Sequence, residues 1–116
     1  MEENKINKVF GIILALEDGK FKYLSKIPGG EIRIYETLLT SLTRQCEEIG
    51  IDISEIQPVF LCFKEKPRSI DFYYALPVDS TSLTEFVETD SKEGFKIFEH
   101  IDQELENEIL KKIIKR

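Results

Sequence analysis

The sequence predicts an α+β domain in which a mixed β-sheet lies between helices. Two kinds of pattern point to this class. Stretches that are continuously apolar or alternating predict five strands, and two stretches with apolar residues at three- and four-residue steps predict helices. A chain of 116 residues can bury one hydrophobic core and is too short for two. We therefore expect a single domain that spans residues 1–116.

The first predicted unit is a β-hairpin. Residues 9–16, VFGIILAL, form a continuously apolar run that is typical of a strand buried on both faces. Asp18-Gly19 favours a tight hairpin turn. Residues 21–26, FKYLSK, alternate, with Phe21 and Tyr23 on one face and the lysines on the other, which predicts the second strand.

A glycine-rich turn and a helix follow this hairpin. Pro28-Gly29-Gly30 ends the alternating pattern and predicts a turn. From about Thr37 to Ile49 the apolar period becomes helical, and Gly50 can end the helix in the left-handed conformation. The residues expected on the buried side of the helix are Leu39, Leu42, Cys46 and Ile49.

The second half of the chain predicts three more strands and a second helix. Residues 58–63 and 70–76 are apolar runs joined by the polar turn KEKPRS, so we expect a second hairpin. Residues 78–91 are polar and are interpreted as an irregular, mobile loop with room for a short strand around Phe86. An alternating stretch around residues 95–98 predicts the last strand. Asp102 can cap a C-terminal helix, whose apolar positions are Leu105, Ile109 and Ile113.

Composition excludes several kinds of partner. The formal net charge is −6, from 22 acidic and 16 basic residues. Because a nucleic-acid backbone is bound by several closely placed Lys or Arg side chains, we expect no nucleic-acid partner. Cys46 and Cys62 fit neither a disulfide framework nor a zinc motif and are interpreted as buried free thiols. No apolar run has the form of a signal peptide or the length of a membrane span, so we expect a cytoplasmic protein with no membrane partner.

Glycine and glutamate residues between Gly30 and Ile51 form a motif. Glu36 follows Gly30 by six residues, and Arg44 follows Glu36 by eight. A Glu-Glu pair then leads to Gly50 and Ile51. With a hairpin before and after it, this arrangement resembles the box of the Nudix hydrolases, G-x5-E-x7-R-E-U-x-E-E-x-G-U, where U is a bulky apolar residue. The resemblance extends over nearly the whole chain and implies the Nudix fold.

The motif departs from the family pattern by one missing residue. Counted forward from Gly30, the Glu-Glu pair arrives one position early, and Gln45 takes the place of the middle glutamate. Counted back from Gly50, the pair matches, but Thr43 stands at the arginine position and Arg44 at the glutamate position. Neither count leaves a carboxylate there, so one of the family's three helix carboxylates is absent.

The resemblance implies a metal-dependent hydrolase that acts on a small nucleoside diphosphate-linked compound. In such an enzyme Mg²⁺ or Mn²⁺ neutralises phosphate oxygens and activates water, and these hard cations take carboxylate ligands. Carried over to this chain, the metal ligands are Glu47 and Glu48, the catalytic residue is Glu48, and the substrate-binding residues are Gly29, Gly30 and Arg44. A replacement for the missing carboxylate would come from a glutamate elsewhere, and the candidates are Glu36, Glu85, Glu88 and Glu93.

Arg44 leaves two other interpretations open. It lies four residues before Glu48, where a guanidinium pairs with the carboxylate and competes with a metal ion. The chain is then a catalytically weak or inactive Nudix-fold module that binds a nucleotide or a protein, or else a structural or dimerising domain whose Glu-Glu pair is solvated surface. The expected partners are accordingly a small nucleotide-type ligand or a second copy of the chain in a homodimer.

Overall fold

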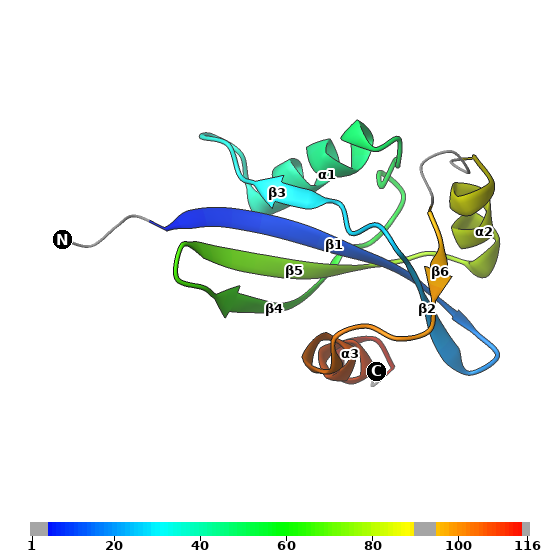
Figure 1. Cartoon of the computed structure of the whole chain (residues 1–116). Helices are drawn as coiled ribbons and strands as arrows, with labels where there is room; N and C mark the ends of the chain where they lie inside the picture. The colour runs from blue at the N-terminus through cyan, green and yellow to red at the C-terminus, as the bar shows by residue number, and fades with distance from the viewer. Residues whose placement is uncertain (1–4, 90–94, 115–116) are drawn as a thin grey trace.

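The computed structural model describes residues 5–89 and 95–114, which form a mixed sheet with helices on both faces (Figure 1). The strands are β1 (Ile6–Glu17), β2 (Lys20–Leu24), β3 (Gly29–Glu31), β4 (Val59–Glu65), β5 (Ser69–Pro77) and β6 (Ile97–Phe98). The helices are α1 (Leu38–Glu48), α2 (Ser80–Thr89) and α3 (Gln103–Ile109), and α3 continues into a π-helical turn (Leu110–Ile114). The predicted α+β class is confirmed. None of the described helices is long and apolar enough to cross a membrane.

β1 is the central strand of the sheet, whose order is β4-β5-β1-β2-β6. Along one side it pairs in parallel with β5, from Ile6 with Ser69 to Leu14 with Pro77. Along the other side it pairs antiparallel with β3 through its first half and with β2 through its second half. A strand with partners on both sides and helices over both faces has few exposed positions, which explains its continuous apolar run.

The turn between β1 and β2 is formed by Asp18 and Gly19, whose φ angles are 53° and 77°. Two central residues with positive φ match the right-handed twist of the flanking strands, as Asp-Gly turns of hairpins do. The predicted first hairpin is confirmed.

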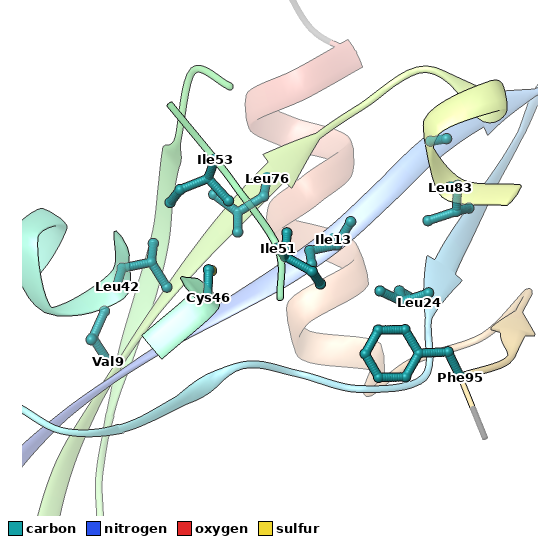
Figure 2. Packing of buried hydrophobic residues seen from close by; sticks show 11 residues of the cluster. Val9, Ile13, Leu24, Leu42, Cys46, Ile51, Ile53, Leu76, Leu83 and Phe95 are labelled. Carbon is teal, nitrogen blue, oxygen red and sulfur yellow. The ribbon is translucent and has the colours of Figure 1, made fainter. Parts of the chain in front are cut away.

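Two hydrophobic clusters form the core, one on each face of the sheet. The α1-side cluster joins strand residues such as Val9 and Ile13 to Leu42 of α1 and Leu83 of α2 (Figure 2). The α3-side cluster comprises Ile12, Leu14, Phe21, Tyr23, Leu61, Ala75, Leu105 and Ile109. Neighbouring residues of β1 thus point to opposite clusters, as the two-residue period of a strand requires.

A helix, α2, replaces the loop that the sequence predicts over residues 78–91. Asp79 starts it, because its carboxylate accepts a hydrogen bond of 2.7 Å from a backbone N–H of the first turn. Leu83 is 1% exposed, and Phe86 and Val87 pack beside it in the α1-side cluster. Their three- and four-residue spacing is a helical signal, but the surrounding Ser and Thr residues are poor helix formers and hide it. Residues 90 and 91 lie outside the described part of the chain.

The predicted turn at Pro28-Gly29-Gly30 is wrong at its glycines, which begin strand β3. The backbone of β3 pairs with Lys8–Phe10 of β1. Gly29 is needed there, because a Cβ would lie 2.3 Å from the Phe10 ring and 2.5 Å from the Val9 carbonyl oxygen. A three-residue strand with two glycines has neither alternation nor branched side chains, so its sequence gives no strand signal.

Helix α1 has the predicted ends but a different buried side. The Thr37 hydroxyl caps its start, and Gly50, with φ of 81°, follows its end. Leu42 and Cys46 are fully buried as predicted, whereas Leu39 is 46% exposed. Leu38 packs against the core in place of Leu39, because the buried stripe runs at steps of four from residue 38 to residues 42 and 46.

The C-terminal elements follow the prediction in part. Asp102 caps α3 by accepting hydrogen bonds from the backbone N–H groups of Glu104 and Leu105 at 2.9 and 3.3 Å. The predicted strand before it is only two residues long, and Phe95, the buried aromatic of that region, lies just ahead of it.

The outer edge of β4 is covered by a lysine. Lys112, in the π-helical turn, donates a hydrogen bond from Nζ to the Leu61 carbonyl at 2.5 Å, and Nζ lies 5.3 Å from the centre of the Phe60 ring. β4 also bulges between Phe60 and Cys62. Lysines and bulges on an edge strand hinder its pairing with another chain.

Candidate functional site

The residues of the predicted box meet where β3, the turn after it and α1 come together. In this turn the Glu36 N–H donates to the Arg33 carbonyl at 3.1 Å, and the Arg33 N–H donates to Glu36 Oε1 at 2.8 Å. Tyr35, between them, has φ of 72° and a fully exposed side chain. The backbone therefore fixes the Glu36 carboxylate in front of α1.

Arg44, from the middle of α1, is the centre of the ion-pair network. Its Nε and Nη2 donate to the two oxygens of Glu36 at 2.7 and 2.9 Å, which is the paired geometry that suits a guanidinium and a carboxylate. Its Nη1 donates to Glu48 Oε1 at 3.0 Å. Further donations from Nη2 reach the Glu31 carbonyl at 3.2 Å and Ser41 Oγ at 3.5 Å. Arg44 thus joins β3, the turn and the last turn of α1.

This network stabilises the charged forms of its members. The hydrogen bonds from Arg44, reinforced by the Arg33 N–H, lower the pKa of Glu36 to about 2. In return, the hydrogen bonds with Glu36 and then with Glu48 raise the pKa of Arg44. The side chains of Arg44 and Glu36 are only 21% and 13% exposed, so water competes little for these contacts. Glu36 and Arg44 remain an ion pair over the whole physiological pH range.

The two adjacent glutamates of the box differ in their surroundings. Glu48 is paired with Arg44, and Nη2 of Arg33 approaches the same oxygen at 4.0 Å. Glu47 is exposed, and no ion pair to it occurs among the described residues. Only Glu48 lines the neighbouring hollow, so the pair does not point into one shared site.

That hollow, of about 240 Å³, lies between α1 and the segment that leads into β3. Its lining comprises Lys26, Ile27, Pro28, Gly29, Gln45, Glu48 and Ile49. Gln45 is buried and donates from Nε2 to the Glu31 carbonyl at 3.2 Å. A Cβ at Gly30 would lie 3.0 Å from the Gln45 amide oxygen, so Gly30 lets this side chain pack against β3. We call this space the α1 hollow.

The described residues do not form the carboxylate cluster that a metal site of the Nudix box requires. Among residues 5–89 and 95–114, no three or more His, Cys, Asp or Glu side chains are grouped so that they could hold a metal ion. An arginine stands between Glu36 and Glu48 and is bonded to both. Of the other candidate donors, Glu85 and Glu88 are exposed on α2, and Glu93 lies outside the described residues. This donor set does not fit the divalent cation that the resemblance implies.

Comparison with solved structures identifies the fold. A mutT/nudix family protein from Listeria innocua has a TM-score of 0.67 at 15% identity, over 84% of this chain and 80% of that chain. The Ap4A hydrolase of C. elegans has a TM-score of 0.54 at 14% identity, over 78% of this chain and 92% of that chain. The Nudix domain of Shewanella oneidensis NrtR, solved with ADP ribose, has a TM-score of 0.51 at 18% identity, over 67% and 63% of the two chains.

The chain has the Nudix fold. The sequence itself matches no protein-family model and no curated protein. At these identities the structural likeness concerns the fold alone, so the chemistry of the box depends on the residues that this chain carries.

Within the Nudix fold, the structure places the predicted site residues in two groups. Arg44, Glu48 and Gly29 lie together around the α1 hollow or its ion-pair network, and Gly30 supports Gln45 beside it. Glu47 stands apart on the exposed side of α1. The roles assigned to all five residues stay predictions.

Sequence reasoning missed the two partners of Arg44 that lie outside α1. The Glu36 carboxylate lies in the turn before α1, so helical spacing does not relate the two residues. The Glu31 carbonyl belongs to the unpredicted strand β3. The Arg44–Glu48 ion pair, in contrast, follows from i, i+4 spacing and is confirmed.

Proposed function

We propose that this chain is a Nudix-fold module that binds a small nucleotide-type ligand and does not hydrolyse it by a metal-dependent reaction. One observation carries the proposal: the Arg44 guanidinium is hydrogen-bonded to both Glu36 and Glu48, and Glu48 is one of the two predicted metal ligands. The class of ligand is supported by the fold, which this chain shares with the NrtR Nudix domain that was solved with ADP ribose.

A divalent cation would have to displace the guanidinium to bind the Glu36 carboxylate, and at Glu48 it would have to bind beside the same guanidinium. Arg44 gives Glu36 two hydrogen bonds at low exposure, and such paired, charge-assisted bonds are among the stronger polar contacts in proteins. If Arg44 stayed in place, its positive charge would repel the incoming cation. Mg²⁺ also gives up its water reluctantly. Each of these effects favours the ion pair over the metal.

The α1 hollow is the place where we expect the ligand to bind. Its volume of about 240 Å³ is small for a binding pocket, so it would hold one end of a nucleotide, such as a phosphate or a ribose. Arg33 and Arg44 both approach Glu48 and balance its negative charge, which removes the repulsion that a phosphate would otherwise meet. Gln45 supplies an amide at the wall for hydrogen bonding.

The proposal is tested by titrating the protein with ADP ribose by calorimetry, once with Mg²⁺ and once with EDTA. We expect the same dissociation constant in both buffers and no cleavage of ADP ribose. Gln45→Ala should weaken binding about tenfold, because it removes an amide from the wall. Glu47→Gln, one helical position outside the hollow, is the matched control and should bind like the wild type. Absence of ADP ribose binding in both buffers would contradict the proposed ligand class.

A metal-dependent hydrolase is the second candidate, because Glu48 is accessible. Its side chain is 54% exposed, and within the described chain Arg44 and Arg33 approach only Oε1. If the wild type cleaved ADP ribose only with Mg²⁺ or Mn²⁺, and Glu48→Gln abolished this cleavage, the hydrolase would replace our proposal.

Arg44→Glu provides an independent check of the displacement argument. The change removes the competing cation and, in the count back from Gly50, restores a carboxylate at the middle glutamate position of the box, so Mn²⁺ should bind at least about tenfold more tightly than to the wild type. Arg33→Glu alters the net charge equally and leaves the Arg44–Glu36 pair in place, so it should change Mn²⁺ affinity much less. Circular dichroism would establish that both variants are folded.

A further inference from the structure

A second hollow lies on the other face of the sheet, between β2, the residues before α3, and α3 itself. In Figure 1 α3 lies on the opposite side of the sheet from α1. The hollow has a volume of about 340 Å³, within the range of small-molecule sites. Its lining comprises Gly19, Lys20, Phe21, Tyr23, Glu99, His100, Glu106 and Leu110. We call it the hairpin hollow. It shares no residue with the α1 hollow.

Tyr23 gives this hollow a polar group without a partner. Its side chain is buried, at 1% exposure, and it forms no hydrogen bond with any residue that the structure describes. In the described chain, every fully buried polar side-chain atom has a hydrogen-bond partner. The Tyr23 hydroxyl is therefore not sealed in the core and opens onto the hollow that Tyr23 lines. Burial, and then the nearby Glu106 carboxylate, raise the pKa of Tyr23 to about 12, so its phenol stays neutral.

The charged side chains that line the hairpin hollow also have no ion-pair partner within the described ranges. Glu99, Glu106, Lys20 and His100 form no ion pair within the described ranges. Two carboxylates and one lysine line the hollow, so these three groups together carry a net negative charge. An unpaired carboxylate beside aromatic rings is a suitable environment for an organic cation, because the face of a ring also attracts positive charge.

The two aromatic rings that line the hairpin hollow lie next to an apolar space. The rings of Phe21 and Tyr23 lie side by side, with centroids 6.5 Å apart. Gly19 and Phe21 also line a neighbouring hollow of about 460 Å³, and the rest of its lining is apolar: Leu14, Ala15, Leu16, Pro77, Val78 and Ile113. A ligand that fits both spaces has a cationic head and an apolar body.

We propose that the hairpin hollow binds an amine with an apolar body, whose ammonium group lies between Glu99, Glu106 and the Tyr23 hydroxyl and whose body covers Phe21. The carboxylates and the phenol oxygen accept the N–H hydrogen bonds of the ammonium group. This site is independent of the nucleotide-type ligand proposed for the α1 hollow.

The test compares two probes that share one body and differ in the head group, n-hexylammonium and hexanoate. His100 is the only histidine of the chain, so its imidazole proton resonances report binding without ambiguity. We expect hexylammonium to shift these resonances saturably and hexanoate at the same ionic strength to leave them unchanged. Equal binding of both probes, tighter binding of hexanoate, or no saturable shift with hexylammonium would overturn the proposal.

Variants locate the site. Glu106→Gln and Glu99→Gln should each weaken hexylammonium binding about three- to tenfold, the effect of losing one partly exposed charge contact. Glu104→Gln, on the same helix but outside the lining, is the matched control and should bind like the wild type. Equal weakening by Glu104→Gln would show that the net charge, and not the hollow, attracts the cation. Addition of ADP ribose should leave the hexylammonium titration unchanged. The proposals for the two hollows are therefore tested independently.

Discussion

Glu36 keeps its negative charge in acid because Arg44 and a backbone N–H hold it. Its pKa in the folded protein, about 2, lies below its ordinary value of 4.5. The ion pair therefore stabilises the folded state fully above pH 4.5, and this contribution is lost as the pH falls toward 2. We expect Glu36→Gln to be less stable than the wild type at neutral pH, and the difference to shrink between about pH 4.5 and pH 2. Urea unfolding at a series of pH values measures it.

The control for this pH dependence is the same substitution without its partner. In an Arg44→Gln background, Glu36→Gln should change the free energy of unfolding less and with a weaker pH dependence, because only the Arg33 N–H then holds the carboxylate. A pH dependence of undiminished size in that background would assign the effect to the Arg33 N–H and not to Arg44.

Tyr35 is held in a backbone conformation that disfavours its side chain. Its φ of 72° costs a residue with a Cβ about 1–2 kcal/mol, and its exposed ring gains nothing from packing. Tyr35→Gly should therefore raise the free energy of unfolding by up to about 1 kcal/mol in urea denaturation. Ile34→Gly is the control, because Ile34 is also exposed but has no positive φ, and it should lower stability. Destabilisation by both changes would show that the Tyr35 ring has an unrecognised contact.

At the scale of elements, the buried face of α1 differs from the predicted one, and two leucines show the difference. The sequence predicts Leu39 and Leu42 on one buried side, whereas Leu42 is fully buried and Leu39 is 46% exposed. Leu42→Ala should lower the free energy of unfolding by about 2–5 kcal/mol, since it leaves a cavity in the α1-side cluster. Leu39→Ala should stay within about 0.5 kcal/mol of the wild type. Equal losses in chemical denaturation would restore the predicted face.

The elements that the sequence predicts are those with strong local signals. Three local patterns in the sequence each predict one feature without reference to distant residues, and all three are confirmed: the apolar run of β1, the Asp18-Gly19 turn and the cap at Asp102. The elements that it misses, β3 and α2, depend on distant contacts. β3 exists because Gly29 fits against Phe10, and α2 because Leu83 reaches the core.

The candidate site divides in the same way. Local spacing within α1 predicts the ion pair of Arg44 with Glu48, which is confirmed. The stronger pair with Glu36 depends on how the turn after β3 folds back, and a one-dimensional pattern does not contain that geometry.

At the scale of the whole molecule, Lys112 and a bulge hinder pairing of the edge strand β4 with another chain. Lys112 covers the Leu61 carbonyl on the outer side of β4. Lys112→Glu should uncover this edge and promote self-association, seen as a concentration-dependent sedimentation coefficient. Lys111→Glu makes the same change in charge at the preceding residue, which forms an ion pair with Glu108, and should not alter self-association. Equal association of both variants would assign the effect to net charge.

The parallel pairing of β1 with β5 has a consequence for biosynthesis. Residues 6–14 of β1 each pair with a residue 63 positions further along, as Ile6 does with Ser69. A ribosome adds about 5–20 residues per second, so β5 is synthesised roughly 3–13 s after β1. Until then the apolar run VFGIILAL lacks its β5 partner and stays partly exposed in the nascent chain. We expect chaperones to bind the nascent chain mainly during this interval.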